Sequence, residues 1–146
     1  RFDGPYGHFT PASLREGAPA AFIAGGIGIT PFLSAVMDED VRRAHPITLH
    51  WSIRSPEDES VAAPLRELAD SGEISMKVVY TRSAPEGHVT GRLGRASLEE
   101  IRQSVASPED LTWFICGPSE FTSAMKDDLL AMGVKRRRIR SERFSW

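Results

Sequence analysis

Short apolar runs alternate along this chain with longer segments in which apolar residues recur at helical spacing. The short runs predict strands at residues 20–24, 47–53, 74–80 and 111–116, and a last strand is expected at 139–144. The run over 47–53 is rich in β-branched and aromatic residues and alternates with period two. The longer segments predict four helices, at about residues 30–40, 60–69, 97–105 and 119–132. Strands that alternate with helices form right-handed βαβ units, so the pattern predicts a parallel sheet.

Cap residues predict where several helices begin and end. Thr30 followed by Pro31 is typical of a helix start, because proline at the first helical position loses no hydrogen bond. Ser97 and Glu100 have the spacing of a capping box, which predicts Ser97 as the N-cap. Gly133 is expected at the C-terminal end of the helix over 119–132. In the helix over 60–69, the residues expected to face the core are Val61, Pro64, Leu65 and Leu68.

One uncharged stretch, residues 18–37, is long enough to cross a bilayer. It contains two prolines and clusters Gly25, Gly26 and Gly28 at its middle, which a strand, a turn and a buried helix explain better than a membrane helix. We therefore predict an α/β, doubly wound (Rossmann-like) fold: a five-stranded parallel sheet with helices on both faces, and no membrane span.

Composition narrows the functional classes. The chain has 146 residues, 40% of them hydrophobic and 26% charged, which suits one globular domain. Eighteen Lys and Arg against 20 Asp and Glu give a formal charge of −2, which argues against a nucleic-acid binder. The single cysteine, Cys116, excludes an internal disulfide, an all-cysteine zinc site and a four-cysteine iron–sulfur cluster. The four histidines lack metal-ligand spacing, so no metal site is expected. With only one cysteine, the composition is that of a cytosolic protein.

Ligands of doubly wound sheets bind beyond the carboxyl ends of the strands, where the strand order switches. A glycine-rich turn follows the first predicted strand: Gly25-Gly26-Ile27-Gly28-Ile29-Thr30-Pro31. Such a turn lets the backbone approach a phosphate. It departs from the usual dinucleotide fingerprint because Pro31 replaces the third glycine, and a tight packing turn is the alternative explanation.

Two further motifs are ambiguous when each is taken alone. Cys116-Gly117-Pro118 ends the fourth predicted strand, where the cysteine either contacts a ligand or is an inert core residue. Glu142-Arg143-Phe144 lies near the C-terminus, where an aromatic residue is usually core or a surface anchor.

Taken together, these motifs resemble the ferredoxin–NADP reductase superfamily. Gly4-Pro5-Tyr6-Gly7-His8-Phe9, the glycine turn, Cys116-Gly117-Pro118 and Glu142-Arg143-Phe144 occur in the family's order. The runs His50-Trp51-Ser52-Ile53-Arg54 and Gly91-Arg92-Leu93 are most similar to the bacterial ferric-reductase-like and NADPH-oxidase-like branch.

The resemblance implies an NAD(P)H-binding domain of a flavin-dependent oxidoreductase, which positions the nicotinamide for hydride transfer to FAD. In the family the turn holds the pyrophosphate and the nicotinamide ribose, the cysteine lies near the nicotinamide C4, and the terminal aromatic stacks on the flavin. The catalytic residues implied here are Cys116, Glu142 and Phe144. Those implied in cofactor binding are Gly25, Gly26, Gly28, Ile29, Thr30, Pro31, Arg54, Ser55, Thr81, Arg82, Cys116, Gly117, Pro118 and Phe144.

Arg54-Ser55 and Thr81-Arg82 follow the second and third predicted strands, where the adenosine 2′ position is read in this family. Arginine and serine there favour the 2′-phosphate of NADPH over NADH. Pairing of either arginine with the nearby Glu57 or Asp58 is the alternative.

The family's flavin-binding barrel precedes Gly4-Pro5-Tyr6-Gly7, so the resemblance predicts that residues 1–12 are a linker from such a barrel and that 13–146 form the NAD(P)H-binding domain. FAD would then be bound mainly by that other domain, and this chain alone would be inactive. Electrons would pass on to haem, ferric iron or oxygen. The expected location is the cytoplasm, either free or as the cytosolic domain of a membrane-bound reductase with a membrane haem domain.

A basic run, Lys135-Arg136-Arg137-Arg138-Ile139-Arg140, suggests a function of a different class. The same scaffold could serve as a non-catalytic interaction module that docks a partner or an anionic surface through this run. A solvated loop is the simpler explanation of the run.

Overall fold

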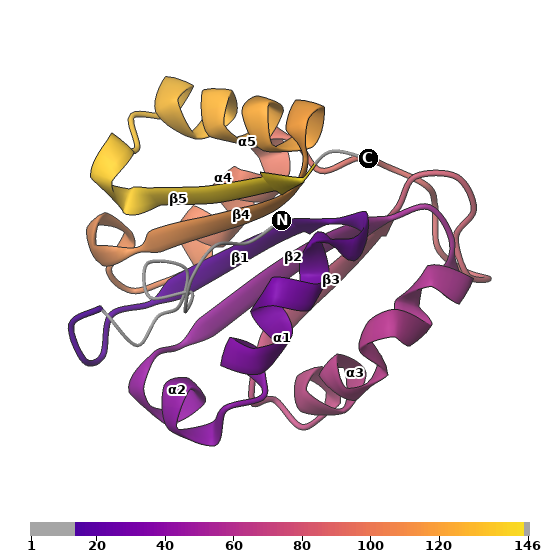
Figure 1. The fold of residues 1–146 in the computed structure, drawn as a ribbon, viewed down its shortest axis with the longest axis horizontal. Helices are drawn as coiled ribbons and strands as arrows, with labels where there is room; N and C mark the ends of the chain where they lie inside the picture. The colour runs from indigo at the N-terminus through magenta and orange to yellow at the C-terminus, as the bar shows by residue number, and fades with distance from the viewer. Residues whose placement is uncertain (1–13, 145–146) are drawn as a thin grey trace.

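A computed structural model describes residues 14–144 and contains a five-stranded parallel sheet in the order β3-β2-β1-β4-β5 (Figure 1). The strands are β1 (Ala20–Gly25), β2 (Ile47–Ile53), β3 (Ser75–Tyr80), β4 (Thr112–Pro118) and β5 (Ile139–Phe144). The helices are α1 (Thr30–Val36), α2 (Glu39–Ala44), α3 (Ala63–Asp70), α4 (Arg95–Ser104) and α5 (Ser119–Ala131). Short 3₁₀ turns are η2 (Gly26–Ile29), η3 (Pro56–Ala62), η4 (Pro108–Asp110) and η5 (Arg136–Arg138). The predicted fold class is confirmed.

Two apolar cores lie on opposite faces of the sheet. Successive side chains of a strand point to opposite faces, and in β1 Phe22 faces α1, α2 and α3 whereas Ile23 faces α4 and α5. Figure 1 shows the two sets of helices on either side of the sheet. Phe22 stacks on Phe32 of α1, with ring centroids 4.6 Å apart, and meets Phe114 of β4 edge-on at 5.2 Å. Burial of both faces of the central strands is what excludes water from a parallel sheet.

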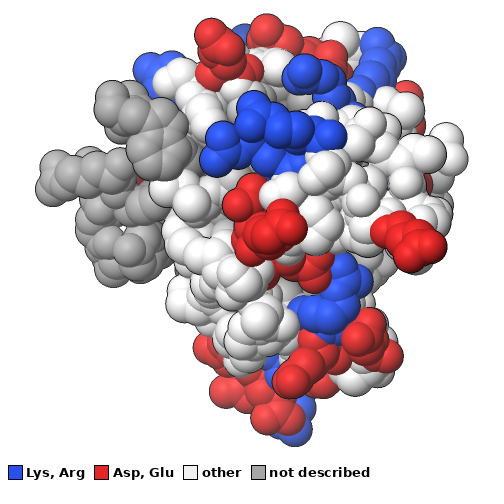
Figure 2. All heavy atoms as spheres, turned by 90° about the vertical axis from the view of Figure 1, so that its right-hand side faces the viewer, with Lys and Arg blue, Asp and Glu red and all other residues white. Residues whose placement is uncertain are grey.

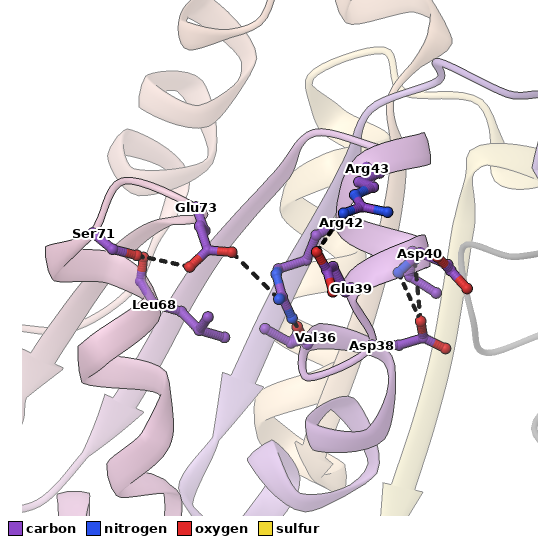
Figure 3. Close-up of polar contacts among 10 residues, drawn as sticks. Val36, Asp38, Glu39, Asp40, Arg42, Arg43, Leu68, Ser71 and Glu73 are labelled. Atoms are coloured by element: carbon purple, nitrogen blue, oxygen red, sulfur yellow. Dashed lines mark hydrogen bonds and ion pairs between the residues drawn. The ribbon is translucent and has the colours of Figure 1, made fainter.

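The predicted helix over 30–40 is wrong, because the chain breaks there into α1 and α2. Asp38 has an extended backbone and its carboxylate accepts hydrogen bonds from the N–H groups of Asp40 and Val41, so it caps a new helix. The guanidinium of Arg42 donates to the carbonyl of Val36 at the end of α1 (2.7 Å) and lies 3.3 Å from Glu73, after α3 (Figure 3). The break is therefore stabilised by side chains that satisfy both new helix ends.

The predicted helix over 60–69 begins later than expected. Residues 56–62 form the turn η3, and α3 starts at Ala63 after Ala62 leaves helical geometry (φ −136°). This change of direction places Leu65 and Leu68 in the core as expected but leaves Val61 and Pro64 exposed, contrary to expectation.

The cap predicted at Ser97 is also wrong. Helix α4 begins at Arg95 with Gly94 as N-cap, and the Ser97 hydroxyl accepts a hydrogen bond from the Gly94 N–H at 3.5 Å. Ser97 therefore lies inside the first turn of α4, and its side chain reaches back to the backbone of the N-cap residue Gly94. At the end of α5, Gly133 has φ +89°, the left-handed geometry expected of a C-terminal glycine.

The uncharged stretch 18–37 forms β1, η2 and α1, as the glycine and proline positions predicted. Within residues 14–144 no helix is both long enough and apolar enough to span a bilayer.

Candidate functional site

The strand order switches between β1 and β4, which are adjacent at the centre of the sheet. From β1 the chain enters η2 and α1 on one face, and from β4 it enters α5 on the other. A cavity of about 680 Å³ opens at this carboxyl edge, within the size range of ligand pockets. The edge lies at the right of Figure 1 and faces the viewer in Figure 2, where basic and acidic groups both appear.

Part of the cavity wall is the predicted glycine turn. Gly25 ends β1, and Gly26 follows with φ +55°, a conformation that few residues other than glycine adopt. Gly26 and Ile27 are exposed and line the cavity, whereas Gly28 and Ile29 are buried. The first N–H groups of a helical turn have no acceptor within the turn, so this backbone can donate to an anion. Thr30 is exposed, and its hydroxyl donates to the carbonyl of Ile27 at 2.8 Å.

Gly28 is required by packing inside the protein. A Cβ built on Gly28 would overlap the carbonyl oxygen of Cys116 and lie 2.6 Å from its carbonyl carbon. The turn therefore sits directly on the end of β4. For Gly28 the structure supports the alternative of a tight packing turn. The exposed Gly26 and Ile27 remain accessible to a ligand.

An aromatic ring that none of the motifs indicated lies at the same place. Phe121, in the first turn of α5, is half-buried and lines the cavity. A Cβ on Gly25 would lie 2.9 Å from its ring, and one on Gly117 would lie 2.7 Å away. Glycine at both positions leaves the room that this ring occupies between β1 and β4.

The Cys116 thiol is fully buried on the α1 face of the sheet. Burial raises the pKa of Cys116 to about 12, and the negative charge of Glu142 acts in the same direction. The thiol is therefore neutral at physiological pH and unsuited to nucleophilic chemistry.

The register of β4 against β5 brings the two C-terminal motifs together. Cys116 is paired with Glu142, Gly117 with Arg143, and Pro118 with Phe144. Glu142 is half-buried. The side chain of Phe144 lies outside the described residues, as does the motif over residues 4–9, so the stacking expected of Phe144 stays a prediction.

The two predicted arginines lie side by side past the ends of β2 and β3. The N–H of Arg82 donates to the carbonyl of Arg54 at 2.9 Å, and Thr81 donates to Ile53 at 2.8 Å. Arg54 and Thr81 line the cavity. Ser55 is adjacent, and its hydroxyl lowers the pKa of the Glu57 carboxyl by hydrogen bonding.

Neither arginine is neutralised by a neighbour. Counting only residues 14–144, no ion pair or side-chain hydrogen bond involves Arg54 or Arg82, although Glu57 and Asp58 also line the cavity. Arg54 thus offers an exposed guanidinium group in the cavity wall, and Arg82, next to Thr81, offers a second one beside it.

The predicted site residues are not all in the cavity wall. Those that line it are Gly25, Gly26, Arg54, Thr81 and Pro118. The others do not line it: Gly28, Ile29, Thr30, Pro31, Ser55, Arg82, Cys116 and Gly117. Sequence reasoning missed Trp51 and Phe121 as wall residues, because buried aromatics in a strand and in a helix have the pattern of ordinary core.

The basic run is remote from this cavity. Residues 135–138 precede β5 and so lie at the amino ends of the strands, at the opposite edge of the sheet (Figure 1). Lys135, Arg136 and Arg137 are exposed, whereas Arg138 is 3.8 Å from Asp110. Arg140 lies over the ring of Phe114, 5.6 Å from its centroid.

Comparison with known proteins assigns the family. The family described as "Oxidoreductase NAD-binding domain" matches residues 22–127. A flavohemoprotein of Rhodopirellula baltica is 34% identical over 149 residues, covering 96% of this chain and 35% of its own length. The phenoxybenzoate dioxygenase subunit beta of Ectopseudomonas oleovorans is 36% identical over 147 residues, covering 98% and 39%. The chain thus spans little more than a third of these relatives.

A similar fold occurs in the crystal structure of a ferredoxin NADP⁺ reductase from Neisseria gonorrhoeae with bound FAD and NADP. The TM-score is 0.75 at 24% identity, over 92% of this chain and 59% of that chain. The family match runs from β1 into α5 and so contains the turn, the strand ends and the cavity. As the motifs predicted, the chain belongs to the oxidoreductase NAD-binding domain family, within the ferredoxin–NADP reductase superfamily.

Proposed function

We propose that the cavity binds NADPH and that this chain holds the nicotinamide for hydride transfer to FAD carried by another domain of the same protein. The observation that carries the proposal is the cavity itself, which joins the glycine turn at the strand-order switch to Arg54 at the end of β2. A dinucleotide has its diphosphate between two nucleosides, so one end can lie at Pro118 and Phe121 while the other reaches the arginines.

The residues present fit NADPH better than NADH. Arg54 and Arg82 are exposed, adjacent and without a carboxylate partner among the described residues, so they are available to the adenosine 2′-phosphate. A guanidinium binds phosphate with two parallel hydrogen bonds, whereas the 2′-hydroxyl of NADH offers no charge. Thr81, in the cavity wall next to Arg82, can add a hydroxyl hydrogen bond.

The bound cofactors supply the redox chemistry, which is hydride transfer from nicotinamide to flavin. This chain's own part is to position one reactant. The neutral, buried Cys116 contributes apolar packing at the end of β4. Glu142, its pairing partner in β5, supplies a carboxylate that can orient polar groups. Phe144, paired with Pro118, would contact the flavin ring.

The proposed partner is an FAD-binding barrel, connected through residues 1–12. The whole enzyme would be a reductase that passes electrons to haem, ferric iron or oxygen, in the manner of the ferric-reductase-like branch. In that setting this chain is a cytoplasmic domain, either free or below a membrane haem domain, and is inactive without the flavin.

Calorimetric titration with NADP⁺ and NAD⁺ tests the proposal. We expect tighter binding of NADP⁺, and we expect Arg54→Ala and Arg82→Ala each to weaken NADP⁺ by roughly 10- to 100-fold, because each removes charge-assisted hydrogen bonds. NAD⁺ affinity should not change in either variant.

Arg137→Ala is the matched control, since Arg137 is exposed at the opposite edge of the sheet. Binding of neither nucleotide by the wild-type chain would refute the proposed function. Equal effects of the arginine variants on NADP⁺ and NAD⁺ would refute the assignment of the 2′-phosphate to these residues.

A further inference from the structure

Trp51 connects the interior of the sheet to the glycine turn. Its side chain is fully buried in β2, on the face covered by α1, α2 and α3. Its indole N–H donates a hydrogen bond to the carbonyl oxygen of Gly26, 2.8 Å away and 25 residues earlier in the chain. A buried indole N–H usually has a hydrogen-bond acceptor. Here the acceptor is the backbone of Gly26, a glycine of the cavity wall.

Gly26 opens the 3₁₀ turn η2, so the hydrogen bonds of that turn and the bond from Trp51 both act on its backbone. Its φ of +55° is one of several conformations that glycine adopts with similar ease, and no atom lies within 4 Å of the place where a Cβ would be. The bond from Trp51 therefore adds to the hydrogen bonds of the turn in holding one orientation of the peptide that joins Gly26 to Ile27.

The orientation of that peptide determines what the cavity presents to a ligand. In a planar trans peptide the C=O and the N–H point in opposite directions. Because the Gly26 carbonyl is held toward the buried indole, the N–H of Ile27 points away from the indole. Gly26 and Ile27 are both exposed and line the cavity. The next carbonyl, that of Ile27, is held in turn by the hydroxyl of Thr30 at 2.8 Å.

We propose that Trp51 is a positioning residue for dinucleotide binding: by holding the Gly26 carbonyl, it directs the Ile27 N–H at the diphosphate. This inference rests on the proposed function, and it assigns to Trp51 an effect on the diphosphate alone. The 2′-phosphate end of the cavity, at Arg54 and Arg82, does not depend on this bond.

Two probes separate these ends. NADP⁺ carries both the diphosphate and the 2′-phosphate, whereas adenosine 2′-monophosphate carries only the latter. For Trp51→Phe, which removes the indole N–H but keeps an aromatic ring, we expect NADP⁺ to bind roughly fivefold more weakly, equivalent to about 1 kcal/mol for one lost hydrogen bond. Binding of adenosine 2′-monophosphate, followed by NMR titration, should be unchanged.

Trp113→Phe is the matched control. Trp113 is as fully buried as Trp51 but lies in the core on the opposite face of the sheet. It should leave the affinities for both probes at the wild-type values.

A second variant keeps the test decisive if Trp51→Phe folds poorly. Gly26→Ala places a methyl group in open space but disfavours the positive φ, so the same peptide turns without loss of core packing. It should weaken NADP⁺ and spare adenosine 2′-monophosphate in the same way.

Each result has a distinct meaning. Unchanged NADP⁺ affinity in both variants overturns the inference, and so does an equal loss for both probes, which would indicate a general structural role. A wild-type chain that does not bind NADP⁺ overturns the proposed function itself.

Discussion

Replacing Gly28 with alanine should destabilise the protein more than any other single methyl group added at the cavity. The new Cβ would overlap the carbonyl oxygen of Cys116 and lie 2.9 Å from the backbone nitrogen of Gly117. Both obstacles are backbone atoms of the central strand β4, so no change of rotamer can relieve the overlap.

The expected cost follows from this geometry. Adding a methyl group to a packed interior costs about 1–3 kcal/mol, and a backbone obstacle puts Gly28→Ala at the upper end, about 3 kcal/mol. For a domain of this size each kcal/mol lowers Tm by roughly 2–4 °C, so Tm should fall by about 6–12 °C. Urea and thermal unfolding, followed by circular dichroism, measure both quantities.

Gly91→Ala provides the comparison. Its Cβ would meet only Val79, at the ordinary contact distance of 3.8 Å, so its stability should stay within about 1 kcal/mol of wild type. If Gly28→Ala were as stable as Gly91→Ala, the close contact between the turn and β4 would be wrong. The prediction also means that lost nucleotide binding in a Gly28 variant reports on packing, not on a contact with the ligand.

Three further predictions concern other parts of the chain. Because burial raises the pKa of Cys116 to about 12, its thiol should react with a disulfide reagent at pH 8 only as fast as the protein opens, and rapid labelling of the native state would contradict this. Burial lowers the pKa of His50 from its ordinary value to about 4, and the charge of Lys77 acts in the same direction whereas that of Glu100 opposes it. As the pH falls, the unfolded chain therefore binds the proton before the folded protein does. The free energy of unfolding should fall by about 2–3 kcal/mol between pH 6.5 and pH 4. A His50→Leu variant that kept the same loss would show that another group causes it. Replacing residues 135–137 together with alanine should leave NADP⁺ affinity unchanged in calorimetry, and a large loss would place the nucleotide at the opposite edge of the sheet.

Much of the fold follows from local pattern. The strands over 47–53 and 139–144 have the bounds predicted. In 47–53 the reason is local, because apolar residues, several of them β-branched or aromatic, alternate with polar ones. The helix break at Asp38 was not predictable from periodicity, since apolar spacing continues across it. The break depends on Arg42 bonding both to Val36 and to Glu73, which is distant in the sequence.

The candidate site was predictable where its residues have a distinctive local signature. The glycine turn and Arg54 have one, and both line the cavity. Trp51 and Phe121 have none, because a buried aromatic in a strand or helix looks like core until the register of neighbouring strands places it. Gly25 and Gly117 leave room for the ring of Phe121, but only the three-dimensional structure shows that the ring lies against them.

The proposed function depends on where the nucleotide binds, and amide NMR of the ¹⁵N-labelled chain during titration with NADP⁺ locates it. We expect the largest shift changes at the amides of Gly26, Ile27, Arg54 and Thr81, which line the cavity, and none at residues 135–138. Shift changes confined to the basic edge, or none at any amide, would contradict it.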